Sequence, residues 1–274
     1  RLRTSLVEFG EIPVEGSIHL TPRSMLALPV NCYLRKPEAT LAYSTSQVFL
    51  ITEMKDRTVL VLYGSKGTQG ELCLRLEEKP VVVGDIRHEW NSRHKVLRLN
   101  YVHPDTEKVF LVRLRAPLEL IITNEERAAR TWLPCFGDEE MPMVSNLYFL
   151  REWEVRDQSI SLLAELEPQK RTEISIVVPR KVRDVMVNVR RIGFSHDKDT
   201  SILSFSLTTK ESPNLVQNLN GTWKARAELL AKEVDYDHSQ WQSWIPGMPL
   251  EALGYMKNGY SWYCLLYTSP SPRD

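Results

Sequence analysis

Short apolar segments, bounded by turn residues, follow one another along the first 125 residues with no helical stretch between them. They include QVFLIT, TVLVLYG, ELCLRLE, KVLRLNYV, KVFLVRL and LELIIT. Their length and their β-branched residues are typical of strands, and strands in such close succession pair antiparallel. A βα barrel is excluded, because it needs strands that alternate with helices over about 250 residues.

A second series of strand-like segments follows residue 140. It comprises SNLYFLREWEV, SISLLAELE, TEISIVVP, VRDVMVNV and SILSFSLT. Between the two series lies ITNEERAARTWLP, in which Thr123 precedes Glu126 by three positions, the spacing of a capping box. We expect a short helix that begins at this box, ends before Pro134 and caps the first domain.

These patterns predict an all-β protein made of tandem antiparallel β-sandwich domains with one short capping helix. We expect an antiparallel β domain over residues 1–140 and a small β-sandwich over residues 141–212. A polar, turn-rich linker is expected over residues 213–235. Aromatic residues gather between residues 241 and 263, where they suit either the core of a β-sandwich or stacking on sugar rings.

The charge balance argues against polyanionic partners. Lysine and arginine together number 35, as do aspartate and glutamate, so the chain carries no formal net charge. Such a chain has no net field that attracts nucleic acid or anionic lipid, and we expect neither as a partner. The basic clusters VNVRRIG and PRKVRD lack an aromatic platform or a glycine-rich turn, which favours the solvated face of a strand pair.

Targeting signals leave the compartment unknown. The sequence has no apolar run of about 18 residues, so no membrane span is predicted. No signal peptide precedes the first strand, but the chain starts at Arg1, and the missing signal therefore proves nothing about secretion.

Neither the cysteines nor the histidines have the spacing of a metal-ligand set. We expect buried free thiols, no metal site and no cofactor. The residues are Cys32, Cys73, Cys135, Cys264, His19, His88, His94, His103, His196 and His238.

Three patterns invite a catalytic interpretation, and each fails on its context. Neighbouring carboxylates on a strand point to opposite faces, so they cannot face each other across a glycosidic bond, and we expect surface charge. In GSKGTQGE, residues 64–71, Lys66 is misplaced for a phosphate loop and a strand follows, which favours a hairpin loop. No Gly-x-Ser-x-Gly elbow or Cys/His pair indicates a nucleophile. The carboxylate pairs are Glu77–Glu78, Glu125–Glu126 and Glu139–Glu140.

The segment LAYSTSQVFLITEMKDRTVLVLYGSKGTQGELCL, residues 41–74, carries a recognisable order of motifs. A Tyr-Ser-Thr strand starts at Tyr43, a Val-Leu-Val-Leu-Tyr-Gly strand ends at Gly64, and a glycine-rich turn leads to Glu71. In this order and spacing the segment resembles the second domain of the family 35 glycoside hydrolases, the β-galactosidases.

Downstream segments keep the order of the same family. Trp132 and Pro134 match the Trp-x-Pro step that closes its second domain, and residues 144–179 resemble its small third domain. GYMKNGYSWY resembles the Gly-Tyr-x-x-Gly-x-x-Trp-Tyr pattern of a jelly-roll, galactose-binding-like domain. We therefore expect residues 236–263 to be the start of a truncated jelly roll, although Cys264 stands where the family usually has arginine.

The resemblance implies a function for the parent protein. Enzymes of this family hydrolyse terminal β-galactosides with retention, using two glutamates on an N-terminal (β/α)8 barrel that this sequence lacks. The chain is therefore expected to be a non-catalytic fragment with no catalytic residue, whose partner is the catalytic barrel of the same parent chain. A second expected partner, the β-galactoside substrate, is bound by the parent enzyme. The alternative is a free-standing carbohydrate-binding or adhesive β-sandwich protein without catalysis.

The last eleven residues, CLLYTSPSPRD, do not resemble any part of a protein domain. They read as the translation of a transposase-end adapter used in sequencing libraries, in a frame that fits a TAC codon for Tyr263. We expect residues 264–274 to be an artefact of library preparation on a metagenomic fragment, which leaves three native cysteines.

Overall fold

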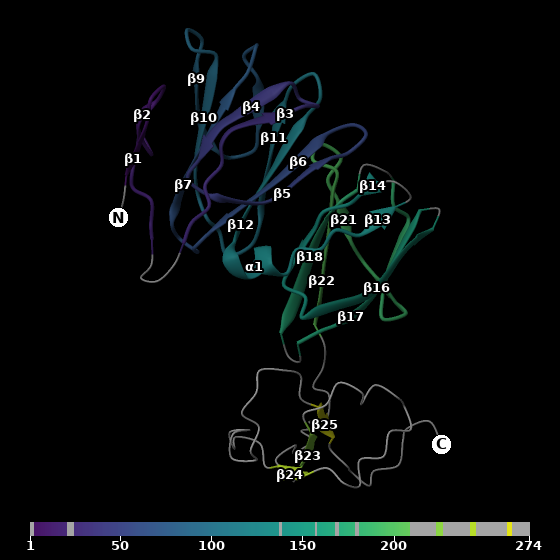
Figure 1. Cartoon of the computed structure of the whole chain (residues 1–274). Coiled ribbons are helices and arrows are strands. Elements are labelled where there is room, and N and C mark those ends of the chain that lie inside the picture. Colours follow the sequence, from purple (N-terminus) through teal and green to yellow (C-terminus); the bar gives the residue numbers. More distant parts are fainter. Residues whose placement is uncertain are drawn as a thin grey trace. The chain divides into compact units, whose positions relative to one another are not determined.

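The computed structural model describes residues 3–20, 25–136, 139–156, 158–167, 170–178 and 181–208, together with three short strands between residues 223 and 264. The chain divides into two compact units, Arg1–Glu211 and Ser212–Asp274. Most of the described residues belong to the first unit, where they form strands and one short helix (Figure 1).

Two five-stranded sheets form the first β-sandwich. The outer sheet has the strand order β3-β4-β7-β10-β9, and the central sheet has the order β5-β6-β12-β11-β8. A hairpin of β1 (Thr4–Leu6) and β2 (Gly10–Ile12) precedes them in the chain. The sheet strands are β3 (Val30–Leu34), β4 (Ala39–Ser44), β5 (Gln47–Glu53), β6 (Thr58–Gly64), β7 (Gln69–Arg75), β8 (Val81–Val83), β9 (Arg87–Asn91), β10 (Val96–Val102), β11 (Lys108–Arg113) and β12 (Leu118–Asn124).

The middle strands of the central sheet, β6 and β12, are buried on both of their faces. On β6, Leu60 and Leu62 pack against the outer sheet, whereas Val59 and Val61 belong to a core shared with the second sandwich. β6 pairs with β12 in parallel, while every other neighbouring pair in these two sheets is antiparallel. Burial on both faces explains why both strands are nearly continuous apolar runs in the sequence.

The helix α1 (Glu125–Ala129) follows β12 directly, and its cap differs from the prediction. Asn124, in an extended conformation, is the N-cap, and its side-chain oxygen accepts a hydrogen bond from the backbone N–H of Arg127 at 3.1 Å. Thr123, the expected cap, is fully buried as a strand residue paired with Tyr63. The capping-box prediction was therefore wrong by one residue, because the strand continues one position further than the spacing indicates.

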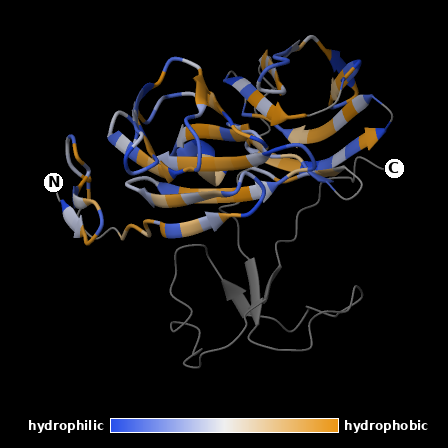
Figure 2. Cartoon of the chain, turned by 90° about the horizontal axis from the view of Figure 1, so that it is seen from above, coloured by the Kyte–Doolittle hydropathy of each residue, from blue (hydrophilic) through white to orange (hydrophobic). Residues whose placement is uncertain are grey.

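The second β-sandwich consists of two four-stranded sheets, ordered β15-β18-β22-β21 and β16-β17-β19-β20. Its core is continuous with Val59, Val61 and Ile121 of the central sheet. Apolar and polar residues alternate along many strands of the unit (Figure 2). The strands and their sheets confirm the predicted all-β architecture of tandem sandwiches. The strands, including the short hairpin β13-β14 that precedes the sandwich, are β13 (Cys135–Phe136), β14 (Glu139–Glu140), β15 (Met143–Ser145), β16 (Phe149–Arg156), β17 (Ser159–Glu165), β18 (Arg171–Val177), β19 (Asp184–Val187), β20 (Arg190–Ile192), β21 (Ser195–His196) and β22 (Ile202–Thr208).

The second unit contains a described sheet of order β24-β23-β25, made of β23 (Trp223–Arg226), β24 (Gln242–Trp244) and β25 (Trp262–Cys264). β23 lies inside the stretch 213–235 that we expected to be a linker, and it is the middle strand. The four residues alternate apolar and basic side chains, a run too short to stand out from its polar surroundings. Most of the expected jelly-roll segment 236–263 and of the expected adapter 264–274 lies outside the described residues.

Candidate functional site

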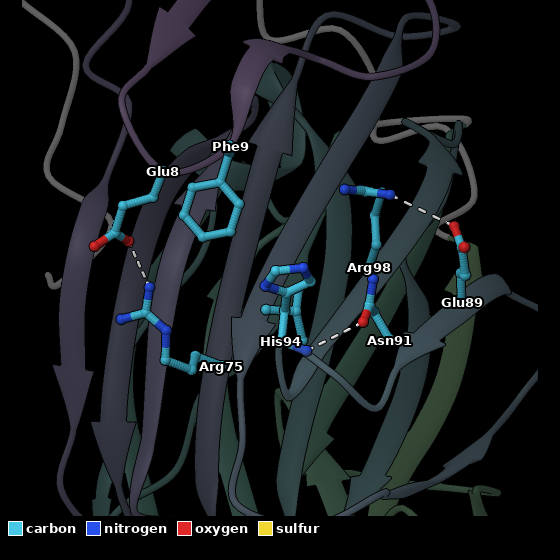
Figure 3. A pocket seen from close by; sticks show the side chains of 8 residues that line it. Glu8, Phe9, Arg75, Glu89, Asn91, His94 and Arg98 are labelled. Atoms are coloured by element: carbon cyan, nitrogen blue, oxygen red, sulfur yellow. Dashed lines mark hydrogen bonds and ion pairs between the residues drawn. The ribbon is translucent and has the colours of Figure 1, made fainter.

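A pocket of about 510 Å³ lies between the turn of the β1–β2 hairpin and the exposed face of the outer sheet (Figure 3). We call it the hairpin pocket. Phe9 and Val96 supply its apolar surface, and six polar or charged side chains surround them. These are Glu8, Arg75, Glu89, Asn91, His94 and Arg98.

Strand register brings the pocket residues of the sheet to one face. Val96 on β10 lies opposite Arg75 on β7 and opposite Asn91 on β9. Two residues along β10, on the same face, Arg98 pairs with Glu89 of β9. Residues directly opposite on neighbouring strands point to the same side of a sheet. Polar side chains of β7, β9 and β10 therefore line the hairpin pocket together.

Two ion pairs frame the hairpin pocket. Arg75 contacts Glu8 at 2.5 Å, and its guanidinium carbon lies 5.9 Å from the centre of the Phe9 ring. Arg98 contacts Glu89 at 3.5 Å, which is long for a charged hydrogen bond. The Nε atom of Arg98 is buried and has no hydrogen-bond partner among the described residues.

Beneath the hairpin, the buried carboxylate of Glu71 anchors the N-terminal segment to the outer sheet. The Tyr43 hydroxyl donates to Glu71 at 2.7 Å, and the backbone N–H of Val14 donates to both carboxylate oxygens, at 3.1 and 3.2 Å. The Phe9 ring meets the Tyr43 ring edge-on, with centroids 5.2 Å apart. Burial, followed by the hydrogen bond to Glu71, raises the pKa of Tyr43, so this hydroxyl remains a donor.

The cysteines differ in exposure from the prediction. Cys73 is buried beside Tyr43, and burial raises the pKa of its thiol to about 12, which keeps it protonated and unreactive at neutral pH. Cys32 is half-buried and Cys135 is exposed, so the expectation of buried thiols was wrong for Cys135. Its strand, β13, belongs to a two-stranded hairpin outside both sandwiches, which offers its side chain no core to enter.

The segment 64–71 was expected to be a hairpin loop, and the structure contradicts this: residues 65–68 connect β6 to β7. β6 and β7 belong to different sheets, so the segment crosses from the central sheet to the outer one. His103 fixes the crossing: its backbone N–H donates to the Thr68 carbonyl and its carbonyl accepts from the Gly67 N–H, both at 2.9 Å. A hairpin and a crossing of this length have the same turn residues, so the sequence did not distinguish them.

A Ser/His contact that the sequence did not indicate lies at the same crossing. The Ser46 hydroxyl is 2.9 Å from Nε2 of His103, while Nδ1 of His103 is 2.9 Å from the Thr68 carbonyl. Burial lowers the pKa of His103. Gly64 packs against this ring, since a Cβ atom there would lie 2.6 Å from it. With a carbonyl rather than a carboxylate as its second partner, His103 holds the chain crossing and has no nucleophile-activating arrangement.

A second buried carboxylate, Glu119 on β12, faces the second sandwich. Arg57 donates to Glu119 at 2.8 Å and to the backbone carbonyl of Thr200 at 2.9 Å. Burial raises the pKa of Glu119 to about 7, although Arg57 acts in the opposite direction. The second oxygen of Glu119 has no partner among the described residues, so its carboxylate is only half satisfied.

A further ion cluster joins the two sandwiches at α1. Arg127, which is buried, contacts Glu107 of the first sandwich and Glu173 of the second, each at 2.6 Å. Because one guanidinium serves carboxylates from both sandwiches, it fixes their relative placement within the first unit.

The adjacent carboxylates divide into two groups. Glu77, Glu78, Glu125 and Glu126 are exposed, as expected. Glu139 is buried and accepts a hydrogen bond from the backbone N–H of Lys55 at 2.8 Å, so the surface-charge prediction was wrong there. Its neighbour Glu140 accepts from the Thr52 hydroxyl at 2.7 Å. The β13–β14 hairpin folds back onto the end of β5, a contact that no local pattern indicates.

The remaining basic and metal-binding candidates have simple positions in the structure. Arg190 and Arg191 lie exposed on β20, which pairs with β19, as predicted for the solvated face of a strand pair. Among the described residues, no three His, Cys, Asp or Glu side chains converge to hold a metal ion. The same part of the chain contains no helix with the length and apolarity needed to cross a membrane.

Comparison with known proteins gives a matching family model, described as β-galactosidase, domain 2, over residues 1–130. The chain is 23% identical over 242 residues to a probable β-galactosidase B of Aspergillus fumigatus, covering 84% of this chain and 23% of that protein. It is 24% identical over 217 residues to a probable β-galactosidase A of Neosartorya fischeri, covering 73% of this chain and 21% of that protein. The chain thus spans less than a quarter of the length of these curated relatives.

Proposed function

We propose that the parent protein hydrolyses terminal β-galactosides, because residues 1–130 match the model of β-galactosidase domain 2, a non-catalytic part of such an enzyme. The match to the domain 2 model carries the proposal. The relatives support it further, because their similarity continues beyond residue 130 through most of this chain. In this proposal the parent is a family 35 enzyme whose catalytic residues lie on a barrel outside this chain.

The role proposed for the present domains is mechanical. The two sandwiches share one hydrophobic core and are joined by the buried arginines Arg57 and Arg127. Such a rigid double sandwich is suited to buttress a catalytic barrel and to hold later domains in place. We also propose domain boundaries near residues 140 and 212. In this proposal, residues 236–263 are the start of a jelly roll and residues 264–274 derive from a sequencing adapter.

An activity assay tests the non-catalytic role. Purified residues 1–263 should release no nitrophenol from a nitrophenyl β-galactoside. Turnover that follows the protein through a second, orthogonal purification step would contradict the proposal.

The DNA upstream of the codon for Arg1 separates the two functional hypotheses. An in-frame (β/α)8 barrel with glutamates at the ends of two strands supports the β-galactosidase. A start codon and signal peptide directly before Arg1 would instead support the free-standing carbohydrate-binding or adhesive protein. Amplifying the native template past the codon for Tyr263 tests the adapter, since a jelly-roll continuation should replace CLLYTSPSPRD.

A further inference from the structure

We propose that the hairpin pocket binds one sugar residue of a neutral oligosaccharide. The proposal rests on the pocket itself and is independent of the parent's proposed reaction. Its volume of about 510 Å³ lies within the range of pockets that hold small ligands. The pocket combines a small apolar surface with a ring of hydrogen-bonding groups, so the chemistry of that ring decides which ligand fits.

The ring contains both kinds of hydrogen-bonding group. Arg75 and Arg98 offer only donors, Glu8 and Glu89 offer only acceptors, and Asn91 offers both. A sugar hydroxyl donates and accepts at once, so it can use neighbouring members of such a mixed ring. A carboxylate only accepts, so it could use the two arginines but not the two glutamates, which would repel it.

The formal charges of the same four ionised residues cancel, which also favours a neutral ligand. Glu8 and Glu89 are largely exposed, with side chains 66% and 72% accessible, and can turn toward a ligand. The Arg98–Glu89 contact is long at 3.5 Å. Glu89 therefore retains capacity for bonds to hydroxyl groups, whereas Arg98 also interacts with the Tyr43 hydroxyl.

The apolar part of the pocket suits the C–H face of a sugar ring. Phe9 lies on the hairpin side (Figure 3), and the nearly buried Val96 belongs to β10 of the sheet. Phe9 is held in place by its edge-on contact with Tyr43 and by Arg75, so this wall is formed before a ligand arrives. A preformed aromatic wall lowers the ordering cost of binding.

Saturation-transfer NMR on the full 274-residue chain tests the proposal with lactose and cellobiose as neutral probes and galacturonic acid as the anionic one. We expect saturable binding of at least one neutral disaccharide, with Kd on the order of 1 mM. No saturable binding of either neutral probe would overturn the proposal, and so would preferential binding of galacturonic acid.

Variants locate the binding. Asn91→Ala and Glu89→Ala alter exposed pocket residues, and each should weaken binding about fivefold to tenfold through a lost hydrogen bond. Lys198→Ala, at an exposed position of the second sandwich, is the matched control and should leave binding unchanged. Binding that neither pocket variant weakens would place the sugar elsewhere and overturn the assignment. Unchanged unfolding midpoints of both pocket variants would show that the lost binding is local.

Discussion

Two glutamates of the first sandwich are almost completely buried, Glu71 beneath the N-terminal hairpin and Glu119 between the two sandwiches. Glu71 has hydrogen bonds on both oxygens, from Tyr43 and from the Val14 amide, which are neutral donors. Glu119 has a charged donor, Arg57, on one oxygen and no described partner on the other. The same residue type in the same fold thus meets neutral donors in one place and a charged donor in the other.

Burial alone therefore does not determine how much a carboxylate contributes to the stability of the fold. Charge-charge attraction across a buried interface demands an intact partner, because an isolated buried charge is costly. A hydrogen bond from a neutral donor to a carboxylate is worth about 1.5–3 kcal/mol, and around Glu71 this contribution is divided between Tyr43 and Val14. Replacing the partners of each glutamate should therefore produce unequal effects.

The largest effect is expected from Arg57→Ala. This change leaves the Glu119 carboxylate and the Thr200 carbonyl without their donor, and should lower the free energy of unfolding by about 3–5 kcal/mol. Denaturant unfolding of the chain measures the loss. The double variant Arg57→Met/Glu119→Leu should recover most of it. A loss from Arg57→Ala no larger than that from Arg113→Ala, which breaks an exposed pair with Asp199, would refute the distinction.

A smaller effect is expected from Glu71→Leu. The change leaves the Tyr43 hydroxyl and the Val14 N–H without an acceptor, and should cost about 2–4 kcal/mol. Amide hydrogen exchange at Val14 should accelerate more than exchange in β12. Glu71→Gln, which keeps one acceptor oxygen, is the matched variant and should cost about 1 kcal/mol. Equal losses from the two variants would mean that packing, and not hydrogen bonding, holds the segment.

The pH dependence of stability should separate the two glutamates further. The pKa of Glu119 is about 7 in the folded chain, above its ordinary value of 4.5. Between these pH values the folded state binds more protons than the unfolded state. The stabilising contribution of Glu119 is therefore complete below pH 4.5 and is lost as the pH rises through 7.

The difference between wild type and Glu119→Gln isolates this contribution, because other carboxylates titrate in both proteins. That difference should change by about 1 kcal/mol per pH unit between pH 4.5 and 7. A difference that is flat over this range would show that Glu119 is ionised throughout.

The smallest effect is expected from Arg87→Ala. Arg87 pairs with Glu15 on the same N-terminal segment that Glu71 anchors, but both side chains are more than half exposed. Water screens such a pair, and its loss should change the free energy of unfolding by less than about 0.5 kcal/mol. Thermal unfolding at low and high salt provides the measurement. A loss as large as that of Glu71→Leu would shift the anchoring role from the buried carboxylate to the surface pair.

Much of the fold was predictable because it depends on local patterns. The doubly buried strands β6 and β12 are continuous apolar runs, and the helix after β12 has its acidic first turn. The cap shifted from Thr123 to Asn124 because the two neighbouring polar residues are both good caps, and only sheet pairing decides which one remains in the strand.

The candidate site was much less predictable. The hairpin pocket joins Glu8 and Phe9 to strands more than 60 residues away, and no spacing rule connects them. The contact between Ser46 and His103 is separated by 57 positions. The buried Glu139 likewise depends on a long-range contact with Lys55. Each of these contacts follows from sheet order, which short segments do not encode individually.

The strands, their arrangement in tandem sandwiches and the short helix follow from patterns in the amino-acid sequence, and its motif order carries the resemblance to a β-galactosidase domain. Such properties depend on side-chain period and on neighbouring residues, which are local. Three features become visible only in the folded chain: which glutamates are buried, the crossing of residues 65–68 between the sheets, and the pocket beside the hairpin. Those outcomes depend on which strands become neighbours, a choice made by the packing of the whole core.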